Sequence, residues 1–302
     1  MKKILSVLLA VTLCASMCLA GCQKSEKSEK NPKDSGTEKE LVDVKLNEVA
    51  HSIFYAPQYV AIEEGYFTKE GIRLECVTGF GADKTMTAVL SGDADIGFMG
   101  AEASVYAYQE GANDAVVNFA QLTQRAGNFL VARKEMPDFK WSDLKGKDIL
   151  GGRAGGMPEM IFEYILKKNG IDPKTDLTID QSINFGLTAA AFTSNDADYT
   201  VEFEPFATGL EKEGSGTVVA SLGVDSGYVP YTAYSAKKSY LEKNPEIIQK
   251  FTNAIQRGLE YVNTHSAEEI AETIKPQFKE TDTATIATII ERYKEQDTWK
   301  ND

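Results

Sequence analysis

Apolar and polar residues alternate over residues 41–49 and again over 72–77, a period of two that predicts two β-strands. Segments in which apolar residues have helical spacing lie between and after these two strands. Glycines end each predicted helix. In chain order the first half predicts helix 57–64, helix 83–90, strand 95–99, helix 101–110 and strand 115–122. This alternation favours an α/β sheet covered on both faces.

A second set of the same kind begins near Lys147. It predicts strand 148–151, helix 157–169, helix 187–193, strand 199–203 and strand 217–222. The two sets share a short motif, because Asp-Ala-Asp precedes a strand both within 89–98 and within 191–200. The match is consistent with two similar lobes, and equally with ordinary helix-to-strand turn chemistry.

The C-terminal part of the sequence is helical. Asn244 is expected to cap a helix that begins at Pro245, and Ser266 with Glu269 forms a capping box for the next one. Asp282 opens the last helix. The apolar residues of these helices fall three or four apart, which is typical of packing against a core.

The N-terminal pattern is that of an export signal. Lys2 and Lys3 precede an apolar run over 4–20 that is short for a membrane span. The run ends in Leu-Ala-Gly-Cys at 19–22, which resembles a bacterial lipobox. The resemblance implies a signal peptide over 1–21, a lipidated Cys22 and attachment to the outer face of the bacterial cell membrane. Residues 22–40 lack large apolar side chains after Cys22 and are expected to form a flexible tether.

Composition narrows the choice of partners. The chain has 302 residues and a net charge of −13, so removal of 21 residues with two lysines leaves 281 residues and −15. Such acidity disfavours binding to nucleic acid. Of the four cysteines only Cys76 would remain as a free thiol, which excludes an intramolecular disulfide in the mature chain.

Four motifs in fixed order carry a family resemblance. They are residues 54–67 (Phe-Tyr-Ala-Pro to Gly-Tyr-Phe), Glu-Gly-Ile at 70–72, residues 90–97, and Asp-Leu-Lys-Gly-Lys at 143–147. Over 41–265 the chain resembles the type II solute-binding proteins of ABC importers for nitrate, sulfonates, taurine and thiamine-pyrimidine precursors. The resemblance implies two Rossmann-like α/β lobes joined by two crossover strands, near 129–133 and 231–236. Lobe I would comprise 41–130 and 235–302, and lobe II 131–234.

The same resemblance implies a monomer that captures a small solute between its lobes and delivers it to an ABC permease with its ATPase subunit. No cofactor is expected. Two alternatives have other functions. One is an enzyme like a eukaryotic thiamine-pyrimidine synthase, whose Cys-rich motif is missing here. The other is an adhesin or sensor domain with the same fold.

Three glycine-containing segments follow predicted strands, at 79–82, 97–101 and 152–156. Helix N-termini that begin there would offer free N–H groups to a ligand, although each segment could equally be a tight turn. None has the sequence of a phosphate loop or a dinucleotide fingerprint. The candidate ligand-binding residues are Gly81, Ala82, Gly100, Ala101, Gly155, Gly156 and Met157.

The family resemblance implies that Glu202 and Glu204 lie at a cleft wall, and their two-residue spacing puts both on one strand face, where they would accept hydrogen bonds from amino groups. The alternative is a solvated strand edge. Arg125 and Arg153 could offset their charge. We therefore expect an aminopyrimidine-like or other heterocyclic vitamin precursor rather than nitrate, taurine or an aliphatic sulfonate.

Aromatic side chains could stack on such a ring, or they could belong to the core. The candidates are Phe54, Tyr55 and Tyr231, and Ser52 and Asn128 complete the predicted ligand-binding set. We expect no catalytic residues, because no Ser–His–acid set assembles, and no metal site, because no Cys/His cluster has metal spacing.

Overall fold

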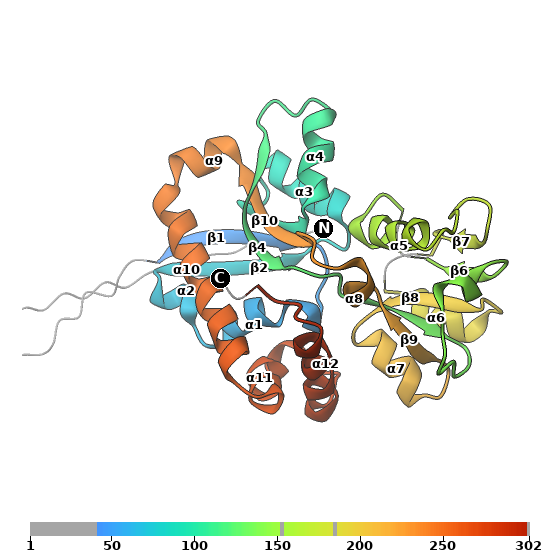
Figure 1. The fold of residues 1–302 in the computed structure, drawn as a ribbon. Coiled ribbons are helices and arrows are strands. Elements are labelled where there is room, and N and C mark those ends of the chain that lie inside the picture. The colour runs from blue at the N-terminus through green and yellow to red at the C-terminus, as the bar shows by residue number, and fades with distance from the viewer. Residues whose placement is uncertain (1–40, 152–153, 184–185, 301–302) are drawn as a thin grey trace, which may run out of the picture. The chain divides into compact units, whose positions relative to one another are not determined.

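The computed structural model describes residues 41–151, 154–183 and 186–300, and shows a mixed α/β fold with two five-stranded sheets (Figure 1). The expected signal peptide 1–21, Cys22 and the tether 22–40 lie outside the described residues, as do Gly152 and Arg153. Within the described ranges, no helix is long and apolar enough to cross a membrane.

The first sheet has the strand order β2-β1-β3-β10-β4. Strands β1, β2 and β3 are parallel, and β10 runs antiparallel to both of its neighbours. The strands are β1 (Val42–Glu48), β2 (Ile72–Thr78), β3 (Ile96–Gly100), β4 (Val116–Thr123) and β10 (Thr232–Lys237). The central position of β10 means that a late segment of the chain completes this sheet.

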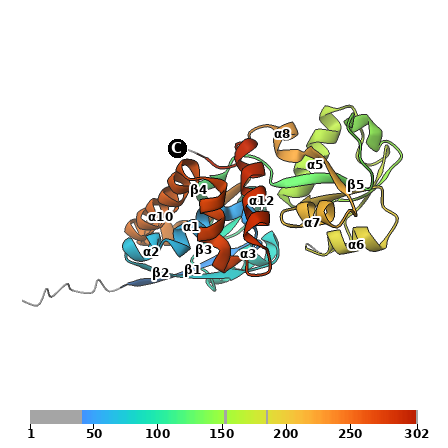
Figure 2. The same cartoon turned by 90° about the horizontal axis from the view of Figure 1, so that it is seen from below.

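Helices cover both faces of the first sheet (Figures 1 and 2). They are η1 (Ile53–Tyr55), α1 (Ala56–Glu63), α2 (Tyr66–Lys69), α3 (Ala82–Ser91), α4 (Glu102–Gln109), α9 (Lys238–Lys243), α10 (Pro245–Thr264), α11 (Ala267–Ile274), η3 (Lys275–Gln277) and α12 (Thr283–Glu295). Under α3 and α4 lies a small separate apolar cluster that includes Met86, Val89 and Met99. Helices η1, α1, α2, α10, α11 and α12 pack on the main core.

The second sheet has the order β7-β6-β8-β5-β9, with β6, β7 and β8 parallel and β5 antiparallel to its neighbours. Its strands are β5 (Asn128–Ala132), β6 (Asp148–Leu150), β7 (Thr178–Asp180), β8 (Tyr199–Phe203) and β9 (Thr217–Ser221). Its helices are η2 (Trp141–Leu144), α5 (Met157–Lys168), α6 (Thr188–Ser194), α7 (Phe206–Lys212) and α8 (Leu222–Ser226).

The repeated Asp-Ala-Asp motif occupies equivalent places in the two sheets. In the first, Asp95 accepts a hydrogen bond from the Lys45 N–H of β1 at 2.9 Å, and its own N–H donates to the Lys45 carbonyl. In the second, Asp198 makes the same two bonds with Asp148 of β6, the first at 3.1 Å. The motif therefore fixes β3 to β1 in the first sheet and β8 to β6 in the second.

The chain passes between the sheets twice, through residues 124–127 and 227–231. Strand pairing puts 128–130 in the second sheet and 232–234 in the first, a few residues from the expected change of lobe. The C-terminal segment lies beside this crossing, since Thr123 and Trp299 form an isolated bridge and the Trp299 ring N–H donates to the Phe54 carbonyl.

Most predicted elements occur, with shifts of a few residues at their ends. The capping box of Ser266 and Glu269 and the Asp282 cap are present as predicted. Asn244 is the N-cap residue of α10 and the helix begins at Pro245, as predicted, but the Asn244 side chain makes no cap hydrogen bond and instead donates to the Tyr240 carbonyl. The short elements α2, β7, α7, α8 and α9 were not predicted, since each spans at most seven residues and shows little periodicity.

Candidate functional site

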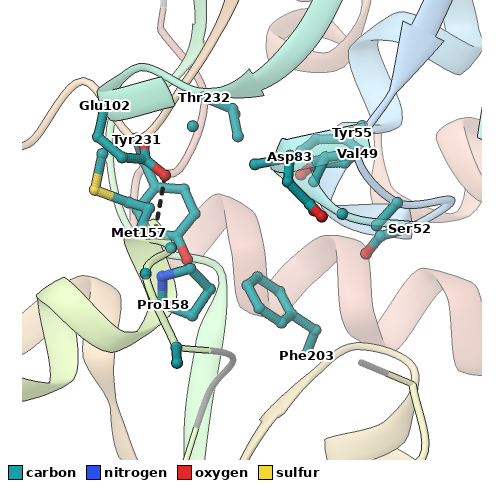
Figure 3. Close-up of a pocket in the computed structure, with 17 residues that line it drawn as sticks. Val49, Ser52, Tyr55, Asp83, Glu102, Met157, Pro158, Phe203, Tyr231 and Thr232 are labelled. Atoms are coloured by element: carbon teal, nitrogen blue, oxygen red, sulfur yellow. Dashed lines mark hydrogen bonds between the residues drawn. The ribbon is translucent and has the colours of Figure 1, made fainter. Parts of the chain in front are cut away.

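A cavity of about 130 Å³ lies between the two sheets (Figure 3). Both sheets and their helix N-termini contribute to its wall. From the first-sheet side come Val49, Ala50, Ser52, Tyr55, Gly81, Ala82, Asp83, Gly100, Glu102, Tyr231 and Thr232, and from the second-sheet side Ala154, Gly155, Gly156, Met157, Pro158 and Phe203. The wall is mainly apolar, with a few polar groups.

Nine of the predicted ligand-binding residues line this cavity: Ser52, Tyr55, Gly81, Ala82, Gly100, Gly155, Gly156, Met157 and Tyr231. Five do not: Phe54, Ala101, Asn128, Glu202 and Glu204. Contact with a ligand stays a prediction for all of them.

Three helix N-termini open onto the cavity. Helices α3, α4 and α5 begin after Gly81, Ala101 and Gly156, and none of these residues caps its helix with a side chain. Uncapped first turns expose backbone N–H groups and carry partial positive charge. Gly81 adopts φ 148°, which a residue with a side chain rarely adopts.

Glu102, the first residue of α4, was not among the predicted residues. It is 8% exposed, and one carboxylate oxygen, Oε1, accepts the Met157 N–H of α5 at 3.0 Å. The other, Oε2, is buried without a hydrogen-bond partner. Burial raises the pKa of this carboxyl above its ordinary value. Its place directly after Gly100 and Ala101, at a predicted strand end, is the signal that could have identified it.

Phe54 lies behind the cavity wall. It is fully buried, with ring centroids 5.1 Å from Tyr55, 5.8 Å from Phe203 and 5.7 Å from Tyr231. These three rings line the cavity, so Phe54 supports them from the core. A Cβ on Gly127, in the first crossing, would clash with the Phe54 ring.

Asn128, at the start of β5, is fully buried, and neither amide atom has a hydrogen-bond partner. It pairs in register with Phe203 on β8, so the two side chains point to the same face of the sheet. The unpartnered amide therefore lies on the same face as a ring of the cavity wall.

Glu202 is buried rather than on a solvated strand edge, at 2% exposure. Its two oxygens accept from the Thr188 hydroxyl at 2.9 Å and the Thr200 hydroxyl at 2.6 Å. Burial raises the pKa of the carboxyl to about 7, and the two hydroxyls only partly oppose this. Protein groups thus already occupy both oxygens expected to face the ligand.

Glu204 is buried as well and is held by an ion pair. Arg292 of α12 donates to it at 2.6 Å and to Glu211 of α7 at 2.8 Å. The Thr208 N–H and hydroxyl donate to the same carboxylate. Burial still raises the pKa of Glu204, although Arg292 opposes the shift. Arg292 links the last helix to the second-sheet side of the crossing.

Two hydrogen bonds join the sides of the cavity. The Ser52 hydroxyl donates to the Glu204 carbonyl at 3.1 Å, and the Met157 N–H donates to Glu102 (dashed in Figure 3). Both come from residues that precede or begin a helix. These two contacts connect the first-sheet side of the cavity to the second-sheet side.

Other candidate groups are engaged elsewhere. Arg125 donates to the Gly223 carbonyl and its guanidinium lies 4.0 Å from the Tyr228 ring centre. His51 contacts Glu48 and the Gln277 carbonyl outside the cavity. Within the part of the chain that the structure describes, no cluster of three or more His, Cys, Asp or Glu residues could hold a metal ion.

A family model described as NMT1/THI5 like matches residues 53–269. The chain belongs to the NMT1/THI5-like family. It is 49% identical over 265 residues to a Bacillus subtilis (strain 168) protein named "Putative binding protein YtlA", which covers 88% of this chain and 79% of that one. The Chloroflexus aurantiacus riboflavin-binding protein RibY is 26% identical over 219 residues, or 69% of this chain and 58% of the relative.

The fold of this family member is that of periplasmic binding proteins. The alkanesulfonate-binding protein SsuA of Xanthomonas axonopodis pv. citri superposes with a TM-score of 0.69 at 15% identity, covering 82% of this chain and 83% of that one. The nitrate-binding protein NrtA of Synechocystis PCC 6803 gives 0.67 at 16% identity, over 82% and 69%. These neighbours agree with the predicted two-lobed α/β architecture.

Proposed function

We propose that this protein is the extracytoplasmic, lipid-anchored substrate-binding subunit of an ABC importer. The observation that carries the proposal is the cavity between two similar sheets, lined from both sides and spanned by two hydrogen bonds. A cavity of this kind captures a solute when closure brings the two sides together around it. A binding protein at 49% identity supports the same role.

The proposed solute is a single-ring nitrogen heterocycle, such as an aminopyrimidine-like vitamin precursor. A cavity of about 130 Å³ is close in volume to a ~150 Å³ protein cavity that binds one benzene molecule. Tyr55, Phe203 and Tyr231 provide aromatic surfaces for a flat ring. Glu102 and the Tyr231 hydroxyl, which is buried without a partner, are suited to bind polar groups at the ring edge.

The alternative is an oxyanion such as nitrate, taurine or an aliphatic sulfonate. Three uncapped helix N-termini favour it. Against it, the described residues that line the cavity include Asp83 and Glu102 and no Lys or Arg. Like-charge repulsion from these two carboxylates disfavours an anion, so we prefer the heterocycle.

In this proposal the nine predicted residues that line the cavity contact the solute, joined by Glu102 and Phe203. Asn128 would contact it through its free amide once the Phe203 ring moves. Glu202 and Glu204 act on the ligand only indirectly, through the position of β8 and the hydrogen bond from Ser52. The crossings at 124–127 and 227–231 would act as hinges.

Outside the cell, the signal 1–21 would be removed and Cys22 acylated, and the segment 22–40 would tether a monomeric domain near its permease. One acyl chain binds a membrane only weakly, so stable anchoring needs more than one. A Cys22→Ser variant should appear in the culture medium rather than in the membrane fraction. Retention of this variant on the membrane would contradict the lipid anchor.

The decisive experiment is native mass spectrometry of freshly purified protein, followed by uptake assays of the retained compound in cells with and without the gene. We expect one retained small molecule and loss of its uptake on deletion. Turnover of the compound by the purified protein would support the enzyme alternative instead. Uptake that is unaffected by deletion would support a sensor or adhesin.

A further inference from the structure

We propose that the Glu102 carboxylate occupies the anion-binding position at the N-terminus of α5, and that it thereby excludes anionic solutes from the cavity. This inference rests on the proposed role of the cavity as the ligand site. It extends that role by naming the residue that sets the charge the site accepts.

The N-terminus of α5 has the features of an anion site. The helix spans 12 residues, its N-cap Gly156 lacks a side chain, and Gly155, Gly156 and Met157 line the cavity. A helix of this length presents unpaired N–H groups and a partial positive charge. In isolation, this geometry would attract nitrate, sulfonate or phosphate.

In this chain a protein carboxylate already occupies that position. Glu102 reaches across from α4 on the opposite side of the cavity, and its Oε1 accepts the Met157 N–H at 3.0 Å (Figure 3). A solute anion would have to displace Glu102 or bind beside it. Two like charges at such a distance repel strongly in a site shielded from water.

The second oxygen of Glu102 gives an independent indication. Oε2 is buried without a partner on a side chain that is 92% buried, since only 8% of it is exposed. Buried polar atoms are normally paired, so an unpaired oxygen on a residue that lines the cavity can take a donor from a bound solute. The geometry therefore assigns to Glu102 an N–H donor from the solute at Oε2, while Oε1 holds α5.

Backbone packing keeps the carboxylate in this position. It lies directly over Gly100, where a Cβ would clash with both of its oxygens. Gly100 has no positive φ, so alanine suits its backbone conformation and would act only by pushing the carboxylate away. Gly100→Ala thus moves the charge without removing it.

The test measures the affinity of the whole mature protein for two probes, methanesulfonate and 4-aminopyrimidine, by titration calorimetry. Glu102→Gln loses the charge but can still accept the Met157 N–H through its amide oxygen. Glu102→Ala vacates the position. We expect affinity for methanesulfonate to increase in the order wild type, Gln, Ala, by about tenfold to hundredfold in total, and affinity for 4-aminopyrimidine to fall by a similar factor.

Two further variants make the outcome specific. Gly100→Ala should weaken 4-aminopyrimidine binding as Glu102→Gln does. Glu110→Gln removes the same charge from the exposed C-terminal end of α4 and should change neither affinity. Thermal unfolding of each variant shows whether it is folded, and Glu102→Gln remains a valid test if Glu102→Ala does not fold.

Tight binding of methanesulfonate by the wild type would overturn the inference, as would unchanged anion affinity in both Glu102 variants. So would a wild type that binds neither probe, or a 4-aminopyrimidine affinity that does not depend on Glu102. Each of these results leaves the uptake experiment untouched, so a solute-binding role can stand while this assignment fails.

Discussion

Buried carboxylates on the two sides of the cavity differ in how completely the protein hydrogen-bonds them. On the second-sheet side, Glu202 and Glu204 have all their oxygens engaged by threonines, a backbone N–H or Arg292. On the first-sheet side, Glu102 keeps one oxygen free. The residue type is the same, and the burial is similar. What separates a structural carboxylate from a candidate ligand group is whether the protein itself supplies every donor.

The contrast shows why residue type alone misdirects a site assignment. Glu202 and Glu204 attract attention by their spacing and their place at a strand end. Their partners, however, come from Thr188, Thr200, Thr208 and Arg292, between 2 and 88 residues away. Four tests follow, ordered by expected effect.

Arg292→Ala should have the largest effect. It leaves Glu204 buried without its cation, and breaking a buried ion pair from one side costs about 3–5 kcal/mol of unfolding free energy. Urea titration measures the loss. The control Arg257→Ala removes only a guanidinium packed on the Tyr66 ring and should cost less than about 1 kcal/mol. Equal losses would mean that the ion pair is not important for stability.

Glu202→Gln should change how stability depends on pH. The folded pKa of about 7 exceeds the ordinary value of 4.5, so Glu202 contributes stability below pH 4.5 that is lost as pH rises through 7. Between pH 5 and pH 8, the Gln variant should gain about 2 kcal/mol relative to wild type. Urea titrations at both pH values measure this difference. A constant difference would show that Glu202 titrates normally.

Gly127→Ala should destabilise the crossing, because its new methyl group would overlap the Phe54 ring behind the cavity. Overpacking of this kind costs about 1–3 kcal/mol. Gly209→Ala in α7 is a matched control for which we expect a gain in stability instead of a loss. Its Cβ meets nothing within 4 Å, so the better helix propensity of alanine should stabilise by about 0.5–1 kcal/mol. Thermal unfolding of both variants compares them, and a stabilising Gly127→Ala would contradict the packing described.

The smallest effects test the similarity of the two lobes. Asp95→Ala and Asp198→Ala each remove the bond from a backbone N–H of the neighbouring strand, β1 or β6, and should each cost about 1 kcal/mol. Asp198→Ala also removes an exposed ion pair with Lys147, which adds at most about 1 kcal/mol. Alanine at the exposed Asp93 or Asp196 should have less effect. Hydrogen exchange of the Lys45 and Asp148 amides should show local loss of protection in the matching variant only. A marked inequality between the two variants would mean that the motifs are not equivalent.

Much of the fold follows from local sequence patterns. Strand alternation, glycine stops and the caps at Ser266 and Asp282 depend on neighbouring residues, so they were predictable. The repeat at Asp95 and Asp198 was visible too, although only the strand pairing shows what it does. The position of the Asn244 cap was predictable, but the hydrogen bond from its side chain to the Tyr240 carbonyl, four residues earlier in α9, was not.

The candidate site was predictable where it depends on backbone. Glycines at strand ends identified three of the cavity-lining segments, because close approach to a helix N-terminus needs small residues. Side-chain partners could not be predicted. Phe54 looks like a stacking residue until its neighbours in the core are known. From the sequence, Glu102 is an ordinary acidic residue in the first turn of a helix. Only the position of α5 across the cavity shows that its carboxylate accepts the Met157 N–H.

Strand β10 lies between β3 and β4, yet it follows the entire second sheet in the sequence. The second sheet is continuous over residues 128–221, so every strand it needs has been translated before β10 emerges. As the chain leaves the ribosome, that half can therefore fold first. The other half must wait for β10, because β10 joins β3 to β4.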